Sequence, residues 1–415
     1  MTTNALSDHF WIIGGGAMQV PLIAEAAELG LCSIVTDRDP QCLCAGLAGL
    51  FEPLDVFDIP GHMQMADRLI AKGVVIRGVL AAGIDAPETM ARLARHLGLP
   101  GVDPAIAQLV HHKADFRARL QALGHPVPAH ASLRAVDLPA LRTIAQRIGY
   151  PLIIKNTDSS GSRGTRIFQR PDLPAMLAVA QEAIAVSRSA TALVESCWEG
   201  SEHTVETLFD IDGRFHRCFI TDRHFDKAEG WALETGLRHP SALPDSMQDE
   251  MYRLAEQVAN EVGITIGAAK FDMMVTVDGP RIIEMTVRLS GGFDCQFLVP
   301  AATGKRVLKA AVLTALGQRI PGGLLQPTRV RVGVTGSLWP APGRIERITG
   351  VDAARSLPGI DQIFFRYAEG EQVQPYTDCT RRVCFIVATG EDEAEAQHNL
   401  TRAAQAIHID TVPTP

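Results

Sequence analysis

Two acidic residues near position 280 have the spacing of a metal site. Asp272 and Glu284 lie in apolar segments that we expect to be strands, and Asp278-Gly279 between them predicts a tight hairpin turn. Antiparallel pairing of these strands would place Asp272 nearly opposite Glu284. Two adjacent carboxylates repel each other unless a cation lies between them, and Mg²⁺ prefers such oxygen ligands together with substrate phosphates. The pattern predicts a magnesium site, with a solvated pair of surface acids as the alternative.

A glycine-rich loop earlier in the chain could cover phosphate groups. The apolar run Tyr150–Ile154 ends in Lys155, and the following segment 156–166 is rich in glycine, serine and arginine. Glycine lets the backbone approach an anion closely, so that N–H groups, hydroxyls and a cation can hold it. The loop indicates a cover for nucleotide phosphates, although a polar hairpin tip would have the same composition.

A cation and a glycine turn follow the second acid. Arg288 lies four residues after Glu284, and Gly291-Gly292 come shortly afterwards. A phosphoryl group in transfer needs groups that are already oriented to neutralise its oxygens. Arg288, beside the expected metal ion, would be such a group.

The composition favours a multidomain globular enzyme and argues against nucleic acid or membrane partners. The 415 residues suffice for two or three domains, and 46% of them are hydrophobic. A net charge of −8 provides no sequence-wide basic field. No apolar run approaches the roughly 18 residues of a membrane helix, and residues 1–9 contain no apolar signal core. The eight cysteines do not form a disulfide framework, so we expect a cytoplasmic protein.

The elements that must position these residues begin with alternating strands and helices. We expect strands at 10–13, 32–36 and 74–80 and helices at 18–29 and 87–97. This order is typical of a doubly wound, Rossmann-like parallel sheet. The glycine turn at 14–16, with Asp37 about twenty residues further on, suggests a dinucleotide fingerprint, but Gln19 replaces the third glycine. A tight turn in the sheet is the favoured interpretation, and an NAD site is the minor alternative.

The remaining sequence predicts a mixed α+β region and a small third unit. Expected helices are 113–123, 138–148, 174–185 and 246–262; expected strands are 150–155, 192–195, 202–209, 214–221, 268–277 and 280–287. Gly322-Gly323 and Pro327 suggest a linker. After it we expect strands at 328–334 and 381–388 and a helix at 391–407.

In combination these residues resemble the ATP-grasp superfamily. Its motifs occur in order over about residues 1–320: Lys113, Lys155 and its loop, Glu195, Glu202, Asp272, Glu284 and Arg288. The segments 338–345 and 357–359 resemble the terminal domain of the L-amino-acid ligases. The resemblance implies an α/β and α+β chain: an N-terminal Rossmann-like domain (1–112), an ATP-grasp domain (113–322, lid subdomain about 125–196) and a small C-terminal α+β domain (323–415).

The resemblance also assigns roles to the site residues. Lys113 and Lys155 would contact ATP phosphates, and the loop with Ser160, Gly161, Ser162 and Gly164 would fold over them; Ser160 and Gly161 would thereby assist catalysis. Glu195, Ser196 and Trp198 would form the adenine hinge, and Glu202 would bind the ribose. Asp272, Glu284 and Thr286 would hold Mg²⁺, with Mn²⁺ as an alternative. Arg288 would stabilise the acyl phosphate and the tetrahedral intermediate.

Two departures from the resembled pattern concern the metal and the substrate. Thr286 stands where the family usually has asparagine, so a second metal ion has a weaker ligand. Leu237 stands three residues after Glu234, where relatives often have histidine, and His239 comes later. Glu234 would hold an incoming amine and His239 a carboxylate, with Arg288, Gly291 and Gly292 completing the substrate pocket; surface polar loops are the alternative for Glu234 and His239.

The implied activity is ATP-dependent ligation of a carboxylate to an amine. ATP would convert the carboxylate, which we expect to be that of an amino acid, to an acyl phosphate with release of ADP, and the amine would then displace phosphate. The alternatives are a carboxylase or purine-biosynthesis ligase of the same fold, or a nucleotide-binding protein without catalysis. We expect small-molecule substrates and, from the family, a homodimer.

Overall fold

The N-terminal part of the computed structural model, which describes residues 8–413, is a parallel sheet with the strand order β3-β2-β1-β4. Its strands are β1 (His9–Ile13), β2 (Cys32–Asp37), β3 (Leu50–Pro53) and β4 (Ile76–Ala81), and its helices are α1 (Val20–Glu28), α2 (Ile59–Ala71) and α3 (Pro87–His96). Four successive apolar residues of β1 are fully buried, as expected for a strand covered on both faces. The prediction of a parallel sheet is confirmed.

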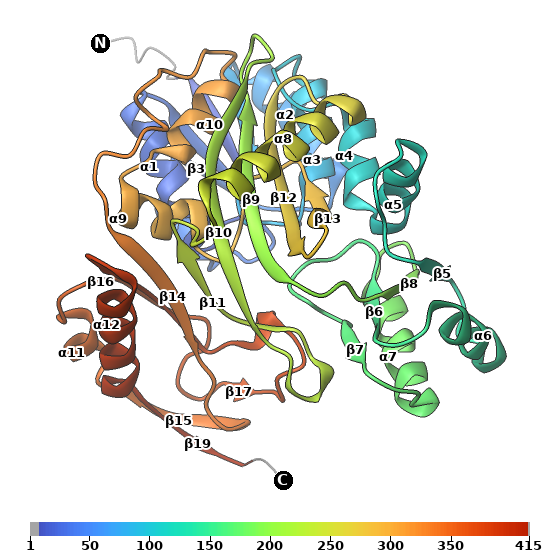
Figure 1. The fold of residues 1–415 in the computed structure, drawn as a ribbon. Coiled ribbons are helices and arrows are strands. Elements are labelled where there is room, and N and C mark those ends of the chain that lie inside the picture. The colour runs from blue at the N-terminus through green and yellow to red at the C-terminus, as the bar shows by residue number, and fades with distance from the viewer. Residues whose placement is uncertain (1–7, 414–415) are drawn as a thin grey trace, which may run out of the picture.

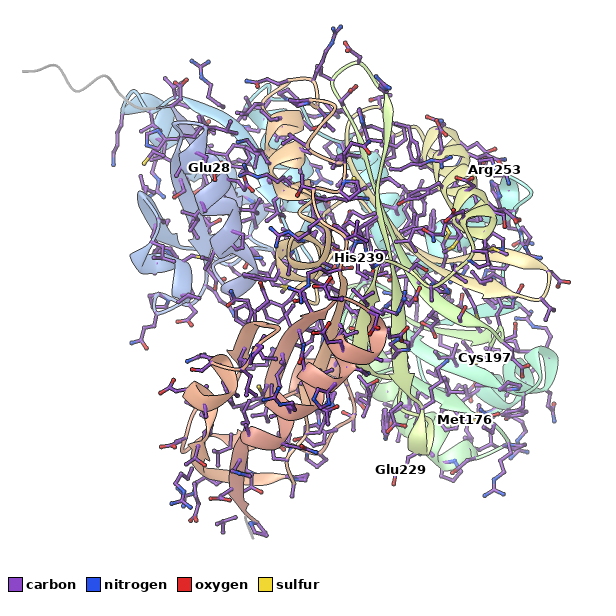
Figure 2. The ribbon with its side chains drawn as sticks, turned by 60° about the vertical axis from the view of Figure 1, so that its left-hand side comes forward. Glu28, Met176, Cys197, Glu229, His239 and Arg253 are labelled. Carbon is purple, nitrogen blue, oxygen red and sulfur yellow. The ribbon has the colours of Figure 1, made fainter. Side chains whose placement is uncertain are left out.

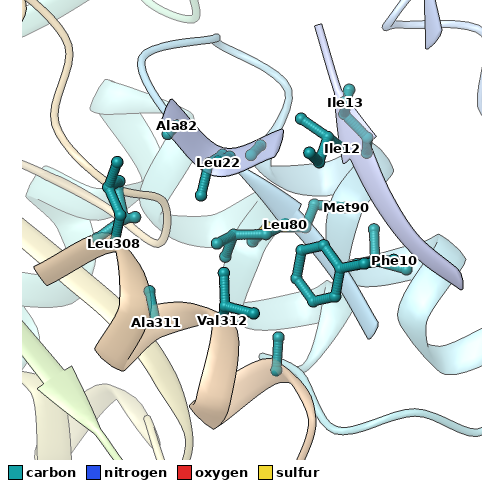
Figure 3. Close-up of a cluster of buried hydrophobic side chains, with 14 of the residues drawn as sticks. Phe10, Ile12, Ile13, Leu22, Leu80, Ala82, Met90, Leu308, Ala311 and Val312 are labelled. Carbon is teal, nitrogen blue, oxygen red and sulfur yellow. The ribbon is translucent and has the colours of Figure 1, made fainter. Parts of the chain in front are cut away.

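A later helix completes the core of this sheet. In Figure 3, Val312 of α10 (Val307–Ala315) lies beside Phe10 and Leu80, and Leu308 lies further along the same helix. All four side chains are almost completely buried. The parallel sheet is thus packed against a helix of the expected central domain, and the two contribute to one hydrophobic core.

The central sheet has eight antiparallel strands in the order β13-β12-β9-β10-β11-β14-β18-β16. They are β9 (Ser201–Phe209), β10 (Phe215–Asp226), β11 (Leu233–His239), β12 (Gly267–Thr276), β13 (Gly279–Thr286), β14 (Val332–Leu338), β16 (Ile360–Phe365) and β18 (Cys384–Gly390). The last three belong to the expected C-terminal unit. That unit therefore extends the central sheet instead of forming a sheet of its own, and the boundary at 323 stays a prediction.

The lid subdomain has its own sheet and core. The strand order is β5-β8-β6-β7, with β5 (His130–Leu133), β6 (Leu152–Asn156), β7 (Arg166–Phe168) and β8 (Ala192–Ser196). Helices α6 (Leu138–Ile148) and α7 (Leu173–Val186) contribute to its apolar core. Figure 1 shows the lid at the lower right and the C-terminal unit at the lower left, with the long central strands above and between them.

The remaining elements connect or cover these sheets. Helices α4 (Pro104–His111) and α5 (Lys113–Ala122) lead into the lid, and α8 (Asp245–Val262) packs on the central sheet. Short helices η1 (Ala17–Gln19), η2 (Leu43–Gly46), η3 (Ala228–Gly230), η4 (Asp294–Leu298), α9 (Val299–Thr303), α11 (Val351–Arg355) and η5 (Cys379–Arg381) lie between longer elements. A three-stranded sheet, β17-β15-β19, and α12 (Glu393–Ala406) complete the C-terminal unit; its strands are β15 (Gly343–Thr349), β17 (Gln372–Val373) and β19 (His408–Val412). No helix within residues 8–413 is long and apolar enough to cross a membrane.

The junction of β11 with β14 is testable at Gly236. A Cβ atom at this position would overlap the carbonyl oxygen of Thr335 on β14. Gly236→Ala should therefore force the two strands apart and lower the free energy of unfolding by about 1–3 kcal/mol. Gly322→Ala is the matched control, because a Cβ there meets no atom within 4 Å. Equal melting temperatures for the two variants would contradict a continuous sheet across this junction.

Candidate functional site

A cavity of about 970 Å³ lies where the lid, the central sheet and the C-terminal unit meet. It also reaches the glycine turn after β1, through Gly16, and the turn after β4, through Gly83. Most of the residues predicted for the site line it: Lys113, Lys155, Ser160, Gly161, Ser162, Glu195, Ser196, Trp198, Glu202, Glu234, Asp272, Glu284, Arg288, Gly291 and Gly292. Gly164, Thr286 and His239 do not.

The acid pair lies on adjacent strands, as predicted. Asp272 on β12 is directly opposite Glu284 on β13. Asp272 accepts a hydrogen bond from Thr204 (3.1 Å) and forms ion pairs with Arg223 (3.0 Å) and Lys270 (2.6 Å). Burial raises the pKa of Asp272, but the charges of Arg223 and Lys270 outweigh burial and hold the pKa below its ordinary value. Asp272 is thus a carboxylate at neutral pH.

The donor set suits a magnesium ion that keeps phosphate and water ligands. Glu284 is about one-third exposed, and the Nζ atom of Lys113 lies 3.6 Å from it. Across residues 8–413 no group of three or more His, Cys, Asp or Glu side chains could hold a metal. Two opposed carboxylates match the usual Mg²⁺ arrangement, in which the substrate supplies other oxygens. Thr286 is opposite Lys270, two pairs further along the same two strands, and its hydroxyl is buried without a partner among the described residues.

The two predicted lysines lie at the lid side of the cavity. Lys113 donates from Nζ to the carbonyl of Ser159 (3.0 Å), and Lys155 pairs with Glu195. Arg117, also on α5, donates to Glu195 at 2.6 Å. Burial raises the pKa of Glu195, but the charges of Arg117 and Lys155 lower it to about 2. Because its carboxylate is neutralised twice, Glu195 has only its backbone to offer a ligand.

The glycine-rich loop divides into two parts. Ser160, Gly161 and Ser162 line the cavity, whereas Gly164 faces helix α7. A Cβ on Gly164 would lie 2.9 Å from the Cα atom of Ala183, and its φ angle is +57°. Gly164 is therefore needed for close packing of the loop on α7, and its predicted position over the phosphates is corrected.

Arg288 is a buried cation with no acidic partner. It is 8% exposed, lines the cavity and donates from Nη1 to the carbonyl of Leu289 (2.9 Å). Its Nε atom has no partner among the described residues, and no acid within residues 8–413 forms a direct ion pair with it. The charge of Arg288 favours the ionised forms of Asp85 and Glu206, which act on it from a longer distance. Because the guanidinium is buried without a direct ionic partner, it could hold a bound anion between the acid pair and the Gly291-Gly292 turn.

Glu234 and His239, both predicted to bind substrate, differ in position. Glu234 lines the cavity and pairs with Arg223 (2.8 Å) and with Arg382 (3.2 Å) of the C-terminal unit. Burial raises the pKa of Glu234, but the charges of the two arginines outweigh burial and lower it. Two cations thus already neutralise the acid that was expected to hold an amine.

His239 does not reach the cavity, which corrects its predicted role. Its ring packs edge-on against Phe219 with 5.8 Å between centroids, and Nδ1 lies 3.1 Å from the carbonyl oxygen of Ile220. Burial lowers the pKa of His239 to about 4, so the ring is neutral. In Figure 2, His239 lies well apart from Cys197, which lines the cavity after β8. A neutral ring enclosed in the sheet cannot orient a substrate carboxylate.

Comparison with known proteins places the chain in a family. Residues 148–296 match the ATP-grasp domain, and residues 337–412 match the L-amino acid ligase C-terminal domain 2. The chain therefore has an ATP-grasp domain followed by an L-amino acid ligase-type C-terminal domain.

Individual relatives agree with this placement. The chain is 28% identical to carnosine synthase 1 of Gallus gallus, over 97% of this chain and 45% of that protein. It is 25% identical to the uncharacterized protein y4rH of Sinorhizobium fredii, over 83% of this chain and 70% of that protein. The chain thus spans about half the length of the carnosine synthases that it matches.

Solved structures show the same fold. The L-amino acid ligase of Bacillus licheniformis superposes with a TM-score of 0.80 at 20% identity, covering 98% of this chain and 99% of that one. The biotin carboxylase domain dimer of Hydrogenobacter thermophilus 2-oxoglutarate carboxylase, solved with MgADP and bicarbonate, superposes with a TM-score of 0.74 at 18% identity, covering 98% and 91% of the two chains.

Several residues of the cavity were not predicted from the sequence. Arg117 lies four residues after Lys113, on the same face of α5, and this helical spacing could have indicated it. Arg382 reaches Glu234 from 148 residues away, and no local pattern signals that contact. Phe364 and Phe385 pack against Phe293 to form an aromatic wall, with the Phe293 and Phe364 rings stacked 4.3 Å apart. The C-terminal unit thus contributes part of the cavity.

Two further buried acids were not predicted either. Glu206 is fully buried on β9; its Oε2 accepts the N–H of Ser290 (2.8 Å), and its Oε1 has no partner among the described residues. Burial raises the pKa of Glu206 to about 7. Burial also raises the pKa of Asp294 well above its ordinary value, although Thr221 donates a hydrogen bond to it.

The raised pKa of Glu206 should make the stability of the folded chain depend on pH. The folded chain keeps this proton to about pH 7, whereas the unfolded chain releases it near pH 4.5. Because the folded state binds more protons in this window, its stability should fall as pH rises from 4.5 to about 7, by on the order of 3 kcal/mol. Glu206→Gln should show a smaller decrease in the free energy of unfolding between pH 5 and pH 8, measured by urea unfolding, because it lacks the contribution of Glu206. Identical losses in the wild type and the variant would contradict the raised pKa.

Proposed function

We propose that this protein is an ATP-grasp carboxylate–amine ligase that activates an amino acid carboxylate as an acyl phosphate and forms an amide or peptide bond. One observation carries the proposal: the opposed acids Asp272 and Glu284, the loop after Lys155 and the unpaired Arg288 all line one cavity. An acid pair for a metal-bound triphosphate and a free cation for a second anion are the parts that carboxylate phosphorylation requires.

In this proposal the nucleotide lies between the lid and the central sheet. Lys113, Lys155 and the Ser160–Ser162 loop face its phosphates, residues 195–198 face its adenine, and Glu202 faces its ribose. The burial of Lys155 beside Glu195 supports this arrangement, because it fixes the ammonium group in place. Asp272 and Glu284 would hold Mg²⁺ or Mn²⁺, which neutralises phosphate charge when bound.

The chemistry follows from the poor reactivity of a carboxylate. A carboxylate oxygen attacks the γ-phosphorus, ADP leaves, and an amine then attacks the acyl carbon as phosphate departs. Arg288 neutralises the charge that develops on the acyl oxygens, and Gly291-Gly292 let the backbone come close. Water must be excluded because it would hydrolyse the acyl phosphate. The loop carbonyl of Gly161 accepts the N–H of Cys379 (3.0 Å), which brings the lid against the C-terminal unit.

The relatives support an amino acid as the acid substrate. The C-terminal match to the L-amino acid ligases and the likeness to carnosine synthases both concern proteins named for joining amino acids or forming peptides. We further propose the division into domains 1–112, 113–322 and 323–415, a homodimer and a cytoplasmic location. A carboxylase is the second candidate, because one structural neighbour was solved with bicarbonate.

A substrate panel tests the activity. ADP release should appear with an L-amino acid supplied together with an amine, and mass spectrometry should find the corresponding amide. ADP release with bicarbonate and an amine, but with none of the twenty L-amino acids, would support the carboxylase instead. Chelation of divalent cations should stop the reaction, and added Mg²⁺ should restore it.

The metal assignment is tested at Glu284. Glu284→Ala should lower ADP release by about 100-fold or more, because one oriented charge at the transferring phosphoryl group is lost. The side chain is partly exposed, so the variant should fold with an unchanged melting temperature. Asp278→Ala, which removes an acid from the exposed hairpin turn, is the control. Full activity in Glu284→Ala would refute the assignment.

A further inference from the structure

Six acidic side chains line the cavity, and five of them have a cationic partner. Glu195 pairs with Arg117 and Lys155, Glu202 with Lys227, Glu234 with Arg223 and Arg382, Asp272 with Arg223 and Lys270, and Glu284 with Lys113. Asp294 is the sixth, and no cation in the described part of the chain forms an ion pair with it. Asp294 is therefore the cavity acid to which a cationic ligand group could bind without displacing a cationic side chain.

The position of Asp294 follows from the turn before it. Gly291 and Gly292 lead to Phe293, which has a left-handed backbone (φ +63°), and Asp294 then begins η4. The side chain is 1% exposed; its Oδ2 accepts from the hydroxyl of Thr221 (2.9 Å), while Oδ1 has no partner in the described structure. A buried carboxylate oxygen without a donor is costly. A ligand that donates hydrogen bonds and carries positive charge would satisfy it.

The charges around Asp294 come from three strands. Glu206 on β9 and Glu234 on β11 repel its charge, and Lys270 on β12 attracts it. Lys270 is already bound to Asp272 at 2.6 Å, and Glu206 has an unpartnered oxygen of its own. The surroundings are therefore rich in acceptors and short of donors. A substrate ammonium group has three donors and no acceptor, which fits this deficit.

We propose that Asp294 receives the ammonium group of the incoming amine substrate and accepts its proton, with Glu206 as a positioning residue behind it. This inference rests on the proposed ligase function and names the group that prepares the amine for attack. Arg288 and Asp294 flank the same glycine turn, so one short segment carries the cation for the acyl phosphate and the acid for the amine.

The proton transfer has a simple balance. The ammonium nitrogen gives one proton to a carboxylate oxygen of Asp294 and becomes a neutral amine with a free electron pair. That pair forms the C–N bond at the acyl carbon, and the C–O bond to phosphate breaks with its electrons leaving on phosphate. The second proton lost from nitrogen leaves with the phosphate. A base of raised pKa suits the first transfer, because its proton affinity approaches that of the amine.

Hydroxylamine provides a nucleophile that does not need this base. It is largely uncharged at neutral pH, whereas an amino acid amine is largely protonated. With an L-amino acid that the wild type activates, Asp294→Asn should form hydroxamate and ADP at the wild-type rate when hydroxylamine is present. With an amino acid amine, amide formation at pH 7 should fall by about 100-fold or more. The deficit should shrink as pH approaches the amine's own pKa.

Glu206→Gln provides an independent readout. Above about pH 7, where Glu206 is charged, removing its repulsion should lower the pKa of Asp294, so the amide-forming rate should rise at a lower pH than in the wild type. If Asp294→Asn does not fold, the pH dependence of amide formation in Glu206→Gln tests the proposal by itself. A pH dependence identical to that of the wild type would then overturn it. Asp278→Asn on the exposed turn is the control and should match the wild type in both reactions.

The outcomes separate this inference from the proposed function. Equal losses of hydroxamate and amide in Asp294→Asn, or no loss of amide, overturn the role of Asp294 while the ligase activity stands. Wild-type protein that releases no ADP and forms no hydroxamate with any L-amino acid overturns the proposed function, and the role of Asp294 with it.

Discussion

The antiparallel pairing of β12 with β13 is the constraint on which the cavity depends. It places Asp272 opposite Glu284 inside a sheet whose other buried side chains are mostly apolar. Acids in such a place need counter-charges, and Arg223, Lys270 and Lys113 supply them. The cavity acids other than Asp294 thus have cationic partners before a ligand binds. Two buried groups of the cavity lining, the Arg288 cation and the Asp294 acid, form no ion pair with a described residue, and the proposals above place ligand charges of the opposite sign there.

The C-terminal unit is part of the cavity as well as of the central sheet. Its strands continue the sheet beyond β11, Arg382 neutralises Glu234, and Cys379 binds the lid loop at Gly161. An acyl phosphate survives only where water is excluded. Contacts between the lid and the C-terminal unit provide a wall that neither could build alone, and they connect the terminal domain to the chemistry proposed for the central sheet.

Much of the fold could be predicted because local periodicity specifies it. The helix expected at 138–148 has those bounds in α6, and the strands around Asp278-Gly279 form the expected hairpin. Helix α2 was missed because its sequence opens with Ile59-Pro60-Gly61, which reads as a turn. Strand β15 was missed because most of its residues are only partly buried or exposed, and its partner β19 comes from the far end of the chain.

The sequence by itself determined the acid pair, because the hairpin turn and the alternation of side chains along the two strands place both acids together. Its local composition also determined the glycine-rich loop after Lys155 and the glycine turn after Arg288. Tertiary structure alone decided which charges meet. Arg382 binds Glu234, and Thr221 binds Asp294, from segments that are distant in the sequence. His239 and Gly164 pack against Phe219 and helix α7 and do not line the cavity. The physical reason is that backbone periodicity is local, whereas neutralising a buried charge depends on whatever side chain the folded chain brings beside it.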